Sequence, residues 1–444
     1  MNITIHRGTD EIGGSCVEME CGKTRILVDI GMPLVNPDKT PFDFKKYAKM
    51  SGEELIEAGI LPNVPGLYPW DDSEAPHGIL ISHAHPDHYG FMNYAKDEIP
   101  VYMSFGTQAM IKVNTLVGSE ITMPPKLTQV EAGVKFTCGD FTILPVLADH
   151  SGFDALSFII DAVGKRVVYS GDLRSHGRKG DKTIDYLKKR AGDKVDALLL
   201  EGTMLGRDDK VITEVELESQ AVELFKATKG PVLIRQSGQN IDRIVSFYKA
   251  AKRTGRIFVV DIYVANVLRS IQDHPKVKGL PQASKDFPEI RVFYPRWLTN
   301  RMMNSTDASK KAVYAFRPFK LIKEEIAEQF DKVVLLVRES FLPDVMRMAE
   351  MNPGSFKNGL FLYSMWEGYK KESKAIEFLD FVKKCGMKEQ SLHTSGHASV
   401  ETLKDLLNDI RPKTLIPIHT FYPERFKEFY ADTILPENGE QIEI

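Results

Sequence analysis

Short apolar runs, rich in β-branched residues and separated by glycine, proline and aspartate, dominate the first 205 residues. Their length and their turn-forming boundaries predict buried β-strands. The runs cover residues 24–31, 77–83, 141–150, 165–172 and 195–203. Each run has an acidic residue or a histidine near its carboxyl end. Because functional loops of α/β sheets follow the carboxyl ends of strands, this pattern indicates a site built from several strand ends.

Residues 206–375 alternate between strand-like and helix-like segments. The order strand, loop, helix occurs at 231–255 and recurs at 256–271 and 332–350, with a closing strand at 359–368. This alternation predicts a doubly wound α/β unit with its own core. The proline-broken stretch 274–297 is predicted to consist mainly of loops.

The last part of the chain, residues 376–444, returns to the first pattern. An amphipathic helix ending in glycine is predicted at 372–386, a second helix at 400–410 and a strand at 414–420. The fold class is therefore α/β, with one domain formed by 1–205 and 376–444 and a second domain, 206–375, inserted into it.

The composition is that of a folded protein with more than one core: 43% of the 444 residues are hydrophobic and 27% are charged. No signal peptide is evident, and no window approaches the roughly 20 apolar residues of a membrane span. The four cysteines are scattered without a C-x-x-C pair. We therefore predict a reduced, cytoplasmic protein without membrane contact.

Positive charge is concentrated within the inserted domain. Residues 225–320 contain 19 Lys and Arg against 6 Asp and Glu, a net charge of +13, whereas the rest of the chain has a net charge of −16. This distribution favours a surface that binds a polyanion, with a solvated lysine-rich face as the alternative. Further candidates for nucleic-acid contacts, each with solvation or core packing as the alternative, are Arg174, Arg178, Arg235, Gln236, Tyr294, Trp297, Tyr363 and Trp366.

The stretch ISHAHPDHYG, residues 81–90, places four potential metal ligands within six positions. His83 and His85 alternate after a strand, so both can face one ion through neutral imidazoles. Asp87 and His88 follow the turn at Pro86 and can reach a second ion. Imidazole and carboxylate ligands without thiolate are typical of zinc, with manganese as an alternative.

Most of the other histidines also lie at predicted strand ends. They are His150, His393, His397 and His419, and Asp172 ends a further strand, where its carboxylate could bridge two cations. One such motif can arise by chance, but this ligand density is hard to explain without metal. His6, His77, His176 and His274 are expected to be structural or merely exposed.

In its order of motifs the sequence resembles the metallo-β-lactamase superfamily. HAHPDH, then His150, Asp172 and a terminal histidine match that fold's metal motifs. Glu201 in LLLEGT, His397 in SGHAS and His419 in IPIHT resemble motifs A, B and C of the β-CASP nucleases, and HTSGHA is similar to ribonuclease J. The resemblance implies a metallo-β-lactamase αββα sandwich with an inserted β-CASP domain.

The resemblance also implies roles for individual residues. One zinc is held by His83, His85 and His150 and the other by Asp87, His88 and His419, with Asp172 between them. Asp29 orients a ligand histidine; a turn-forming aspartate is the alternative. Asp87 orients the attacking water, and His397, tuned by Glu201, protonates the leaving oxygen or stabilises the transition state. Apart from the resemblance, His393, Ser395 and Gly396 precede a predicted helix, where backbone N–H groups and the Ser395 hydroxyl favour binding of the substrate phosphate; an ordinary helix cap is the compatible alternative.

These features predict a ribonuclease with two zinc ions per chain that cleaves single-stranded RNA as a 5′-exonuclease, an endonuclease or both. His419 at motif C favours RNA, because the DNA-repair relatives have an apolar residue there. A DNA nuclease is the runner-up, followed by a small-molecule hydrolase and a non-catalytic RNA-binding scaffold. Relatives of ribonuclease J usually have a further domain after motif C, whereas this sequence continues for about 25 residues, and so a homodimer is left open.

Overall fold

The computed structural model describes residues 1–36, 40–207 and 210–444. These residues form two compact units. Unit 1 comprises residues 1–111, 121–209 and 396–444, and unit 2 comprises residues 112–120 and 210–395. The sequence-based domain boundaries at 205/206 and 375/376 stay predictions.

Unit 1 contains two mixed β-sheets. The first has the order β19-β1-β2-β3-β4-β5-β6 and the second the order β18-β11-β10-β9-β8-β7. The strands of the first sheet are β1 Asn2–Arg7, β2 Cys16–Cys21, β3 Thr24–Val28, β4 Gly78–Leu80, β5 Val101–Met103, β6 Leu127–Gln129 and β19 Gln441–Glu443. The strands of the second sheet are β7 Phe136–Cys138, β8 Phe141–Leu147, β9 Leu156–Ala162, β10 Lys165–Tyr169, β11 Ala197–Glu201 and β18 Thr414–Ile418.

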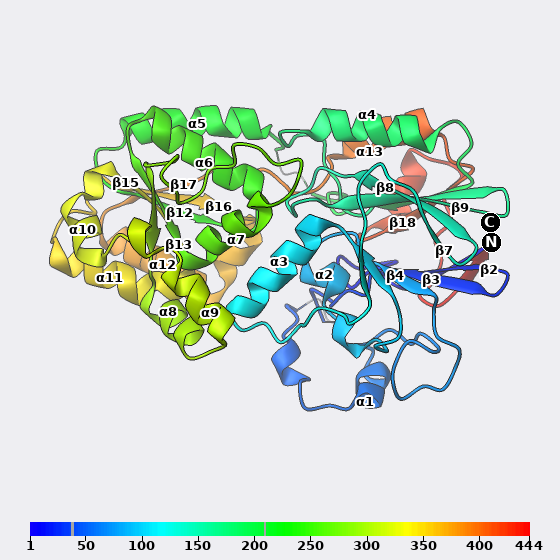
Figure 1. Ribbon diagram of the computed structural model, residues 1–444. Helices are drawn as coiled ribbons and strands as arrows, with labels where there is room; N and C mark the ends of the chain where they lie inside the picture. Colours follow the sequence, from blue (N-terminus) through cyan, green and yellow to red (C-terminus); the bar gives the residue numbers. More distant parts are fainter. Residues whose placement is uncertain (37–39, 208–209) are drawn as a thin grey trace. The chain divides into compact units, whose positions relative to one another are not determined.

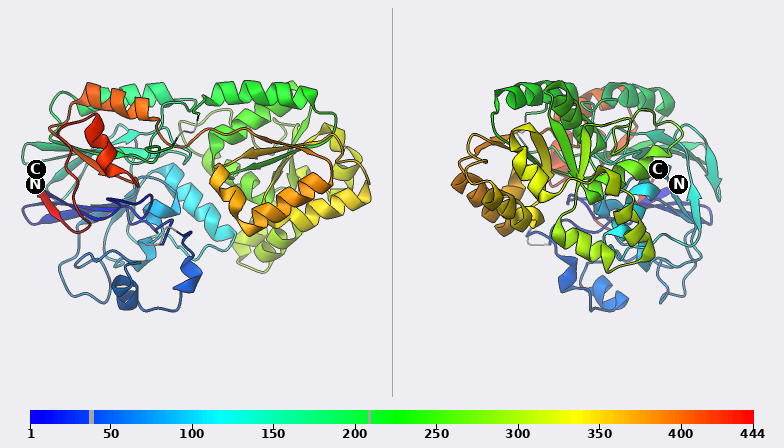
Figure 2. Two further views of the ribbon diagram at one scale, coloured as in Figure 1. Left: turned by 180° about the vertical axis from the view of Figure 1, so that it is seen from behind. Right: turned by 60° about the vertical axis from the view of Figure 1, so that its left-hand side comes forward.

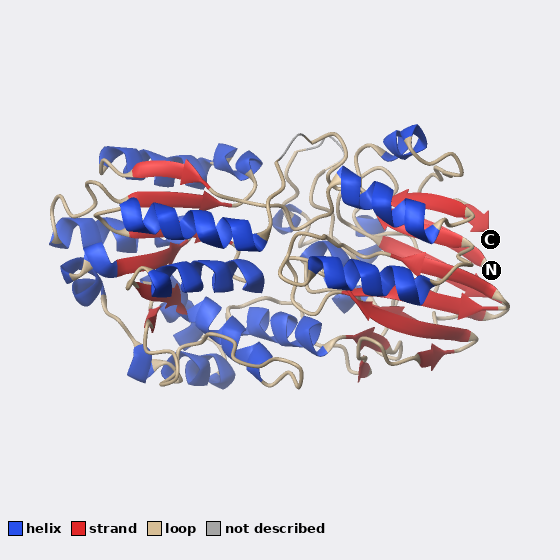
Figure 3. Ribbon diagram, turned by 90° about the horizontal axis from the view of Figure 1, so that it is seen from above, coloured by secondary structure: helices blue, strands red, loops and turns tan. Residues whose placement is uncertain are grey.

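The two sheets of unit 1 pack face to face because alternate residues of their strands are apolar. Val17 and Ile26 of the first sheet share one buried cluster with Phe158 and Leu199 of the second. The outer face of the second sheet is covered by α4, Gly180–Ala191, and α13, Val400–Ile410. Figure 1 shows these layers edge-on, with α1 (Gly52–Glu57) beyond the first sheet, and Figure 3 looks down on the two helices above the second.

The sequence of α13 explains why it is a helix and why it packs there. The Ser399 side chain caps its first turn by accepting a hydrogen bond from the backbone N–H of Thr402. Its apolar residues recur at helical spacing and are buried against the second sheet. Unit 1 also contains α2, Pro86–Tyr89, and the first part of α3, Phe105–Leu116, whose residues from 112 onward belong to unit 2.

Unit 2 is built on one sheet of parallel strands in the order β14-β13-β15-β12-β16-β17. Its strands are β12 Val232–Gln236, β13 Ile257–Asp261, β14 Ile290–Phe293, β15 Val333–Val337, β16 Leu360–Ser364 and β17 Lys388–Ser391. Its helices are α5 Glu214–Ala227, α6 Ile241–Arg253, α7 Ile262–Gln272, α8 Arg296–Met303, α9 Asp307–Tyr314, α10 Lys323–Glu328, α11 Leu342–Met351 and α12 Ser373–Lys384.

Helices cover both faces of the unit 2 sheet. In the left view of Figure 2, α5 lies above the sheet and α11 and α12, in yellow to orange, lie below it. Residues of α10, α11 and α12 share a buried cluster with β12, β13, β15 and β16. The doubly wound α/β architecture predicted for the insertion is therefore confirmed. The stretch 274–297 is less irregular than expected, since it contains β14 and the start of α8.

Among the described residues, no helix combines the length and the apolar character that crossing a membrane requires. Cys16, Cys21 and Cys138 are buried free thiols and Cys385 is a partly exposed one.

Candidate metal centre

The segment between β4 and α2 presents the first four candidate ligands. His83 and His85 follow β4, His85 has an extended backbone, and Pro86 occupies the first position of α2, where it has no N–H to leave unpaired. Asp87 and His88 then lie in the single turn of that helix. Gly31, after β3, is required for this approach, because a Cβ there would lie 1.7 Å from the carbonyl oxygen of Asp87.

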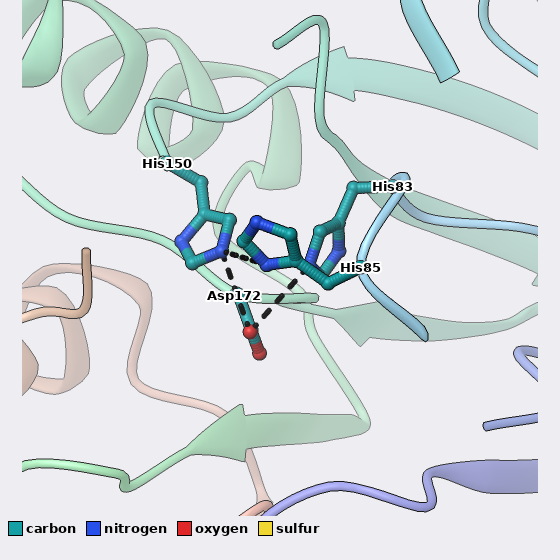
Figure 4. Close-up of side chains that lie close together, drawn as sticks. All are labelled: His83, His85, His150 and Asp172. Carbon is teal, nitrogen blue, oxygen red and sulfur yellow. Dashed lines mark hydrogen bonds and ion pairs between the residues drawn. The ribbon is translucent and has the colours of Figure 1, made fainter. Parts of the chain in front are cut away.

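A first group of donors consists of His83, His85, His150 and Asp172, whose potential ligand atoms all lie within 4.8 Å of one another. The Nδ1 atom of His85 lies 3.1 Å from Nε2 of His83 and 3.0 Å from Nε2 of His150. Oδ2 of Asp172 lies 3.6 Å from each of the same two Nε2 atoms. Figure 4 shows the three imidazoles and the carboxylate directed toward a common point.

A second group consists of Asp87, His88 and His419. The Oδ2 atom of Asp87 lies 3.2 Å from Nε2 of His419 and 3.9 Å from Nε2 of His88. Asp172 also reaches this group, since its Oδ2 lies 3.3 Å from His88 Nε2 and its Oδ1 lies 3.7 Å from His419 Nδ1. One carboxylate thus lies beside both groups of donors.

Burial and charge suit this cluster to cations. Burial holds the pKa of His83 and of His150 well below the ordinary value, which keeps both imidazoles neutral, the form that binds metal. At His88 burial also lowers the pKa, but the carboxylates of Asp172 and Asp29 overcome it and raise the pKa well above normal. A position that favours positive charge on an imidazole also favours a metal cation beside it.

Two buried polar atoms of the cluster are in positions where a metal ion would satisfy them. Within the described part of the chain, His88 Nε2 and Asp172 Oδ1 have no hydrogen-bond partner. Buried polar atoms are normally paired, and these two atoms, one in the second group and one on the shared carboxylate, are potential metal ligands. The donor set of imidazoles and carboxylates without thiolate fits zinc or manganese.

Asp29 contacts the Nδ1 atom of His88. Its Oδ2 lies 2.8 Å from His88 Nδ1 and accepts hydrogen bonds from the Tyr169 hydroxyl at 2.7 Å and the Ser82 hydroxyl at 2.8 Å. Its backbone has a φ of 62°, a conformation that is uncommon outside glycine and asparagine or aspartate. Asp29 can therefore form a turn with its backbone and, at the same time, hold a histidine with its side chain.

Two other histidines of the cluster, His150 and His419, also have their second nitrogen held. His150 Nδ1 lies 2.6 Å from the carbonyl oxygen of Gly396, and His419 Nδ1 lies 2.8 Å from Oγ1 of Thr203. Such partners fix the tautomer and the ring plane of a ligand histidine. Thr203, Ser82 and Tyr169 could not be recognised from the sequence, because hydroxyl side chains follow no characteristic spacing around a metal site.

His397 lies at the edge of the cluster, paired with Glu201. Its Nδ1 lies 3.2 Å from Oε1 of Glu201 and 3.7 Å from Oδ2 of Asp172. Burial lowers the pKa of His397, but the two carboxylates outweigh it and the net shift is upward. Glu201 is itself buried and also accepts a hydrogen bond from the backbone N–H of Thr203 at 2.9 Å.

The segment that contains the predicted substrate-binding residues is anchored by its backbone. Gly396 follows Ser395, and its carbonyl accepts from His150. In unit 2, the Arg243 side chain donates to the carbonyl of Thr394 at 3.0 Å and lies 3.4 Å from His393 Nδ1. Because the α13 N-cap is Ser399, the SGH sequence precedes the helix rather than forming its first turn.

Two further candidates have structural partners. Arg174 is fully buried and its Nε donates to Asp149 Oδ1 at 3.0 Å, so it supports the backbone next to His150 instead of contacting nucleic acid. Arg235 is paired with Glu339 at 2.5 Å. Arg174 is therefore too deeply buried to contact nucleic acid, whereas Arg235 is partly exposed and already has a carboxylate partner.

Comparison with known proteins agrees with the fold and the cluster. A family model described as a beta-lactamase superfamily domain matches residues 52–235, and one described as a Zn-dependent metallo-hydrolase RNA specificity domain matches residues 384–436. A solved structure of a protein of unknown function from Enterococcus faecalis V583 has the same fold, with a TM-score of 0.77, 21% identity and 99% coverage of both chains. The fold and the donor cluster thus define a member of the metallo-β-lactamase superfamily.

Curated relatives place the chain more narrowly. It is similar to ribonuclease J of Helicobacter pylori strain B128, with 25% identity over all of this chain and 60% of the relative. It is also similar to ribonuclease J of Mycobacterium tuberculosis H37Rv, with 22% identity over 94% of this chain and 68% of the relative. The chain spans about 60% of the length of the Helicobacter pylori relatives. Over nearly its whole length the chain is thus similar to ribonuclease J-like proteins of the β-CASP type.

Proposed function

We propose that the protein is a metal-dependent ribonuclease that hydrolyses phosphodiester bonds of single-stranded RNA with two zinc ions, or manganese in their place. The observation that carries this proposal is the position of Asp172, whose carboxylate lies 3.3–3.7 Å from imidazole nitrogens of both donor groups. The match of residues 384–436 to an RNA specificity domain supports RNA as the polymer.

The residues that would hold the cations divide as the two donor groups do. His83, His85 and His150 would hold one ion, and Asp87, His88 and His419 would hold the other, with Asp172 shared. Bound divalent cations would supply an activated water and neutralise charge on the transferring phosphoryl group.

Asp87 is suited to orienting the attacking water and accepting its proton. Burial raises its pKa, but the hydrogen bond from His419 and the charges of His88 and His419 lower it to about 2. The side chain is therefore a carboxylate at neutral pH and keeps an acceptor oxygen for the water.

His397 is suited to the opposite task. The Glu201 carboxylate accepts from its Nδ1 and favours the imidazolium form, which can donate a proton to the oxygen that leaves the phosphorus. Glu201 thus acts through His397. Ser395, Gly396 and His393 would bind the substrate phosphate by their hydroxyl, backbone N–H and imidazole groups.

The decisive experiment gives the purified protein, with bound metal counted by mass spectrometry, matched RNA and DNA oligonucleotides. Each oligonucleotide carries either a 5′-monophosphate or a 5′-hydroxyl, and the His85→Ala variant excludes contaminating nucleases. We expect RNA cleavage that the variant lacks, and a preference for the 5′-monophosphate would assign a 5′-exonuclease. Internal cuts that ignore the 5′ end would assign an endonuclease, and cleavage of DNA alone would replace RNA as the substrate. Two bound ions without cleavage of either polymer would refute the proposal.

A further inference from the structure

The positive charge of unit 2 is least neutralised in one short region, residues 294–320. This region contains six Lys and Arg and a single acidic residue, Asp307, which pairs with Lys310 at 3.2 Å. Elsewhere in unit 2 many cations have carboxylate partners, for example Arg253 with Glu218 at 2.9 Å. Among the described residues, the other five cations of the region make no ion pair with a carboxylate: Arg296, Arg301, Lys311, Arg317 and Lys320.

The same region exposes large aromatic rings. Trp297 on α8 is 56% exposed and Tyr314 at the end of α9 is 44% exposed, whereas the apolar residues on the inner sides of these helices are buried. Large exposed apolar groups that gather on one surface, rather than lying singly, are typical of interaction sites. Figure 1 shows α8 and α9 as neighbouring helices of one surface layer of unit 2.

Each ring has a cation over its face. The guanidinium carbon of Arg301 lies 5.4 Å from the centroid of Trp297, and that of Arg317 lies 4.1 Å from the centroid of Tyr314. Lys320 Nζ lies 5.1 Å from the ring of Tyr294, whose hydroxyl donates to the carbonyl of Val313 and so ties β14 to α9. These contacts hold the cations in place at the surface.

The chemistry of this arrangement matches a single nucleic-acid strand. Unpaired bases stack on tryptophan, tyrosine and guanidinium planes, while the guanidinium N–H groups and lysine bind phosphate oxygens. An acidic protein surface would satisfy the charges but not the exposed rings. A base-paired helix would offer phosphates but no free base faces.

We propose that Trp297, Arg301, Tyr314, Arg317 and Lys320, named here the basic–aromatic surface, form a docking surface for single-stranded RNA in addition to the metal centre. The proposal rests on the proposed function for the identity of the polymer. The basic–aromatic surface holds the RNA strand and takes no part in cleaving it.

Two variants and a control test the surface. In one variant the rings are removed, Trp297→Ala with Tyr314→Ala, and in the other the charges are removed, Arg301→Gln, Arg317→Gln and Lys320→Gln. The control Lys383→Gln, Lys384→Gln, Lys388→Gln removes three exposed lysines from α12 and β17 of the same unit. All chains carry His85→Ala so that the RNA stays intact, and thermal unfolding verifies that each variant is folded.

Fluorescence anisotropy with an unstructured 20-nucleotide RNA gives the affinity at several salt concentrations. We expect the ring variant to bind about 10-fold or more weakly, and the charge variant to lose about 2 from the slope of log affinity against log salt. Heparin, a polyanion without bases, should bind equally to the ring variant and the parent.

Three outcomes would overturn the proposal. RNA affinity that is unchanged in both surface variants excludes the surface, and a loss as large in the lysine control shows that only total charge matters. An equal loss of heparin and RNA binding in the ring variant excludes stacking. Because binding is measured without cleavage, failure of the unsubstituted protein to cut RNA would refute the proposed function separately from the surface.

Discussion

Removal of Arg243 should destabilise unit 2 strongly, because its partner is buried. Arg243 on α6 and Glu214 on α5 have side chains that are 1% and 0% exposed, and the guanidinium Nε and Nη2 lie 3.1 and 3.0 Å from Oε1 of Glu214. Ser246 also donates to this carboxylate at 3.0 Å. In an Arg243→Met variant the Glu214 charge would stay buried and would lose its Arg243 partner.

The magnitude follows from that geometry. Leaving one member of a buried ion pair without its partner costs about 3–5 kcal/mol of unfolding free energy. For a unit of this size, such a loss lowers the melting temperature by roughly 10 °C. Replacing both members by apolar side chains is often nearly neutral, so Arg243→Met with Glu214→Leu should recover most of the loss.

Urea titration measures the free energy of unfolding of both the single and the double variant. With Trp70→Phe in the background, the fluorescence reports on the two tryptophans of unit 2, Trp297 and Trp366. The matched control is Arg253→Met on the same helix, whose side chain is 59% exposed and pairs with Glu218; it should cost less than about 1 kcal/mol. A loss below about 1 kcal/mol in Arg243→Met, or a double variant as unstable as the single, would refute the reasoning.

The stable double variant also separates folding from substrate binding. Arg243 donates to the carbonyl of Thr394 and to Ser364, and so it holds the segment that contains His393 and Ser395. We expect the double variant to have a raised KM for RNA with kcat and metal content largely kept. An unchanged KM would show that the segment does not depend on Arg243.

The remaining predictions concern unit 1. Asp172→Asn should lose metal, because a neutral amide is a poor bridge between cations; two ions per chain by mass spectrometry would contradict the shared-ligand role. His397→Ala should keep its metal and lose RNA turnover by about 100-fold or more, whereas undiminished cleavage would leave it a structural residue. Glu18 is partly desolvated, which raises its pKa, but hydrogen bonds from His6 and Arg25 lower it from 4.5 to about 2. Its contribution, about 2 kcal/mol after allowance for solvent screening, is present above pH 4.5 and lost as the pH falls towards 2. Glu18→Gln should therefore lower the free energy of unfolding at neutral pH and weaken its dependence on pH between 4.5 and 2. A pH series of urea titrations in which the variant keeps the pH dependence of the parent would contradict this prediction.

The amino-acid sequence alone determined the local features of this protein. Apolar runs bounded by glycine, proline and aspartate predicted β3, β4, β8, β10 and β11, and helical periodicity predicted α12 and α13. The spacing of His83, His85, Asp87 and His88 indicated two neighbouring sets of ligands, since six residues behind one strand lie close in any fold. The missed strand β14 lies in a proline-rich stretch, where local propensity is weak and the pairing with β13 provides the order.

The tertiary structure decided which distant residues meet. His150, Asp172 and His419 follow β8, β10 and β18 of the second sheet, and the pairing of the strands, not their sequence, brings them to the residues that follow β4 of the first sheet. The tertiary structure also decided which arginines have a carboxylate partner. Nothing in the sequence distinguishes Arg174 and Arg235 from Arg301 and Arg317, yet the first two pair with carboxylates that are distant in the sequence. Periodicity is a property of neighbouring residues, whereas burial and ion pairing depend on contacts that only the folded chain creates.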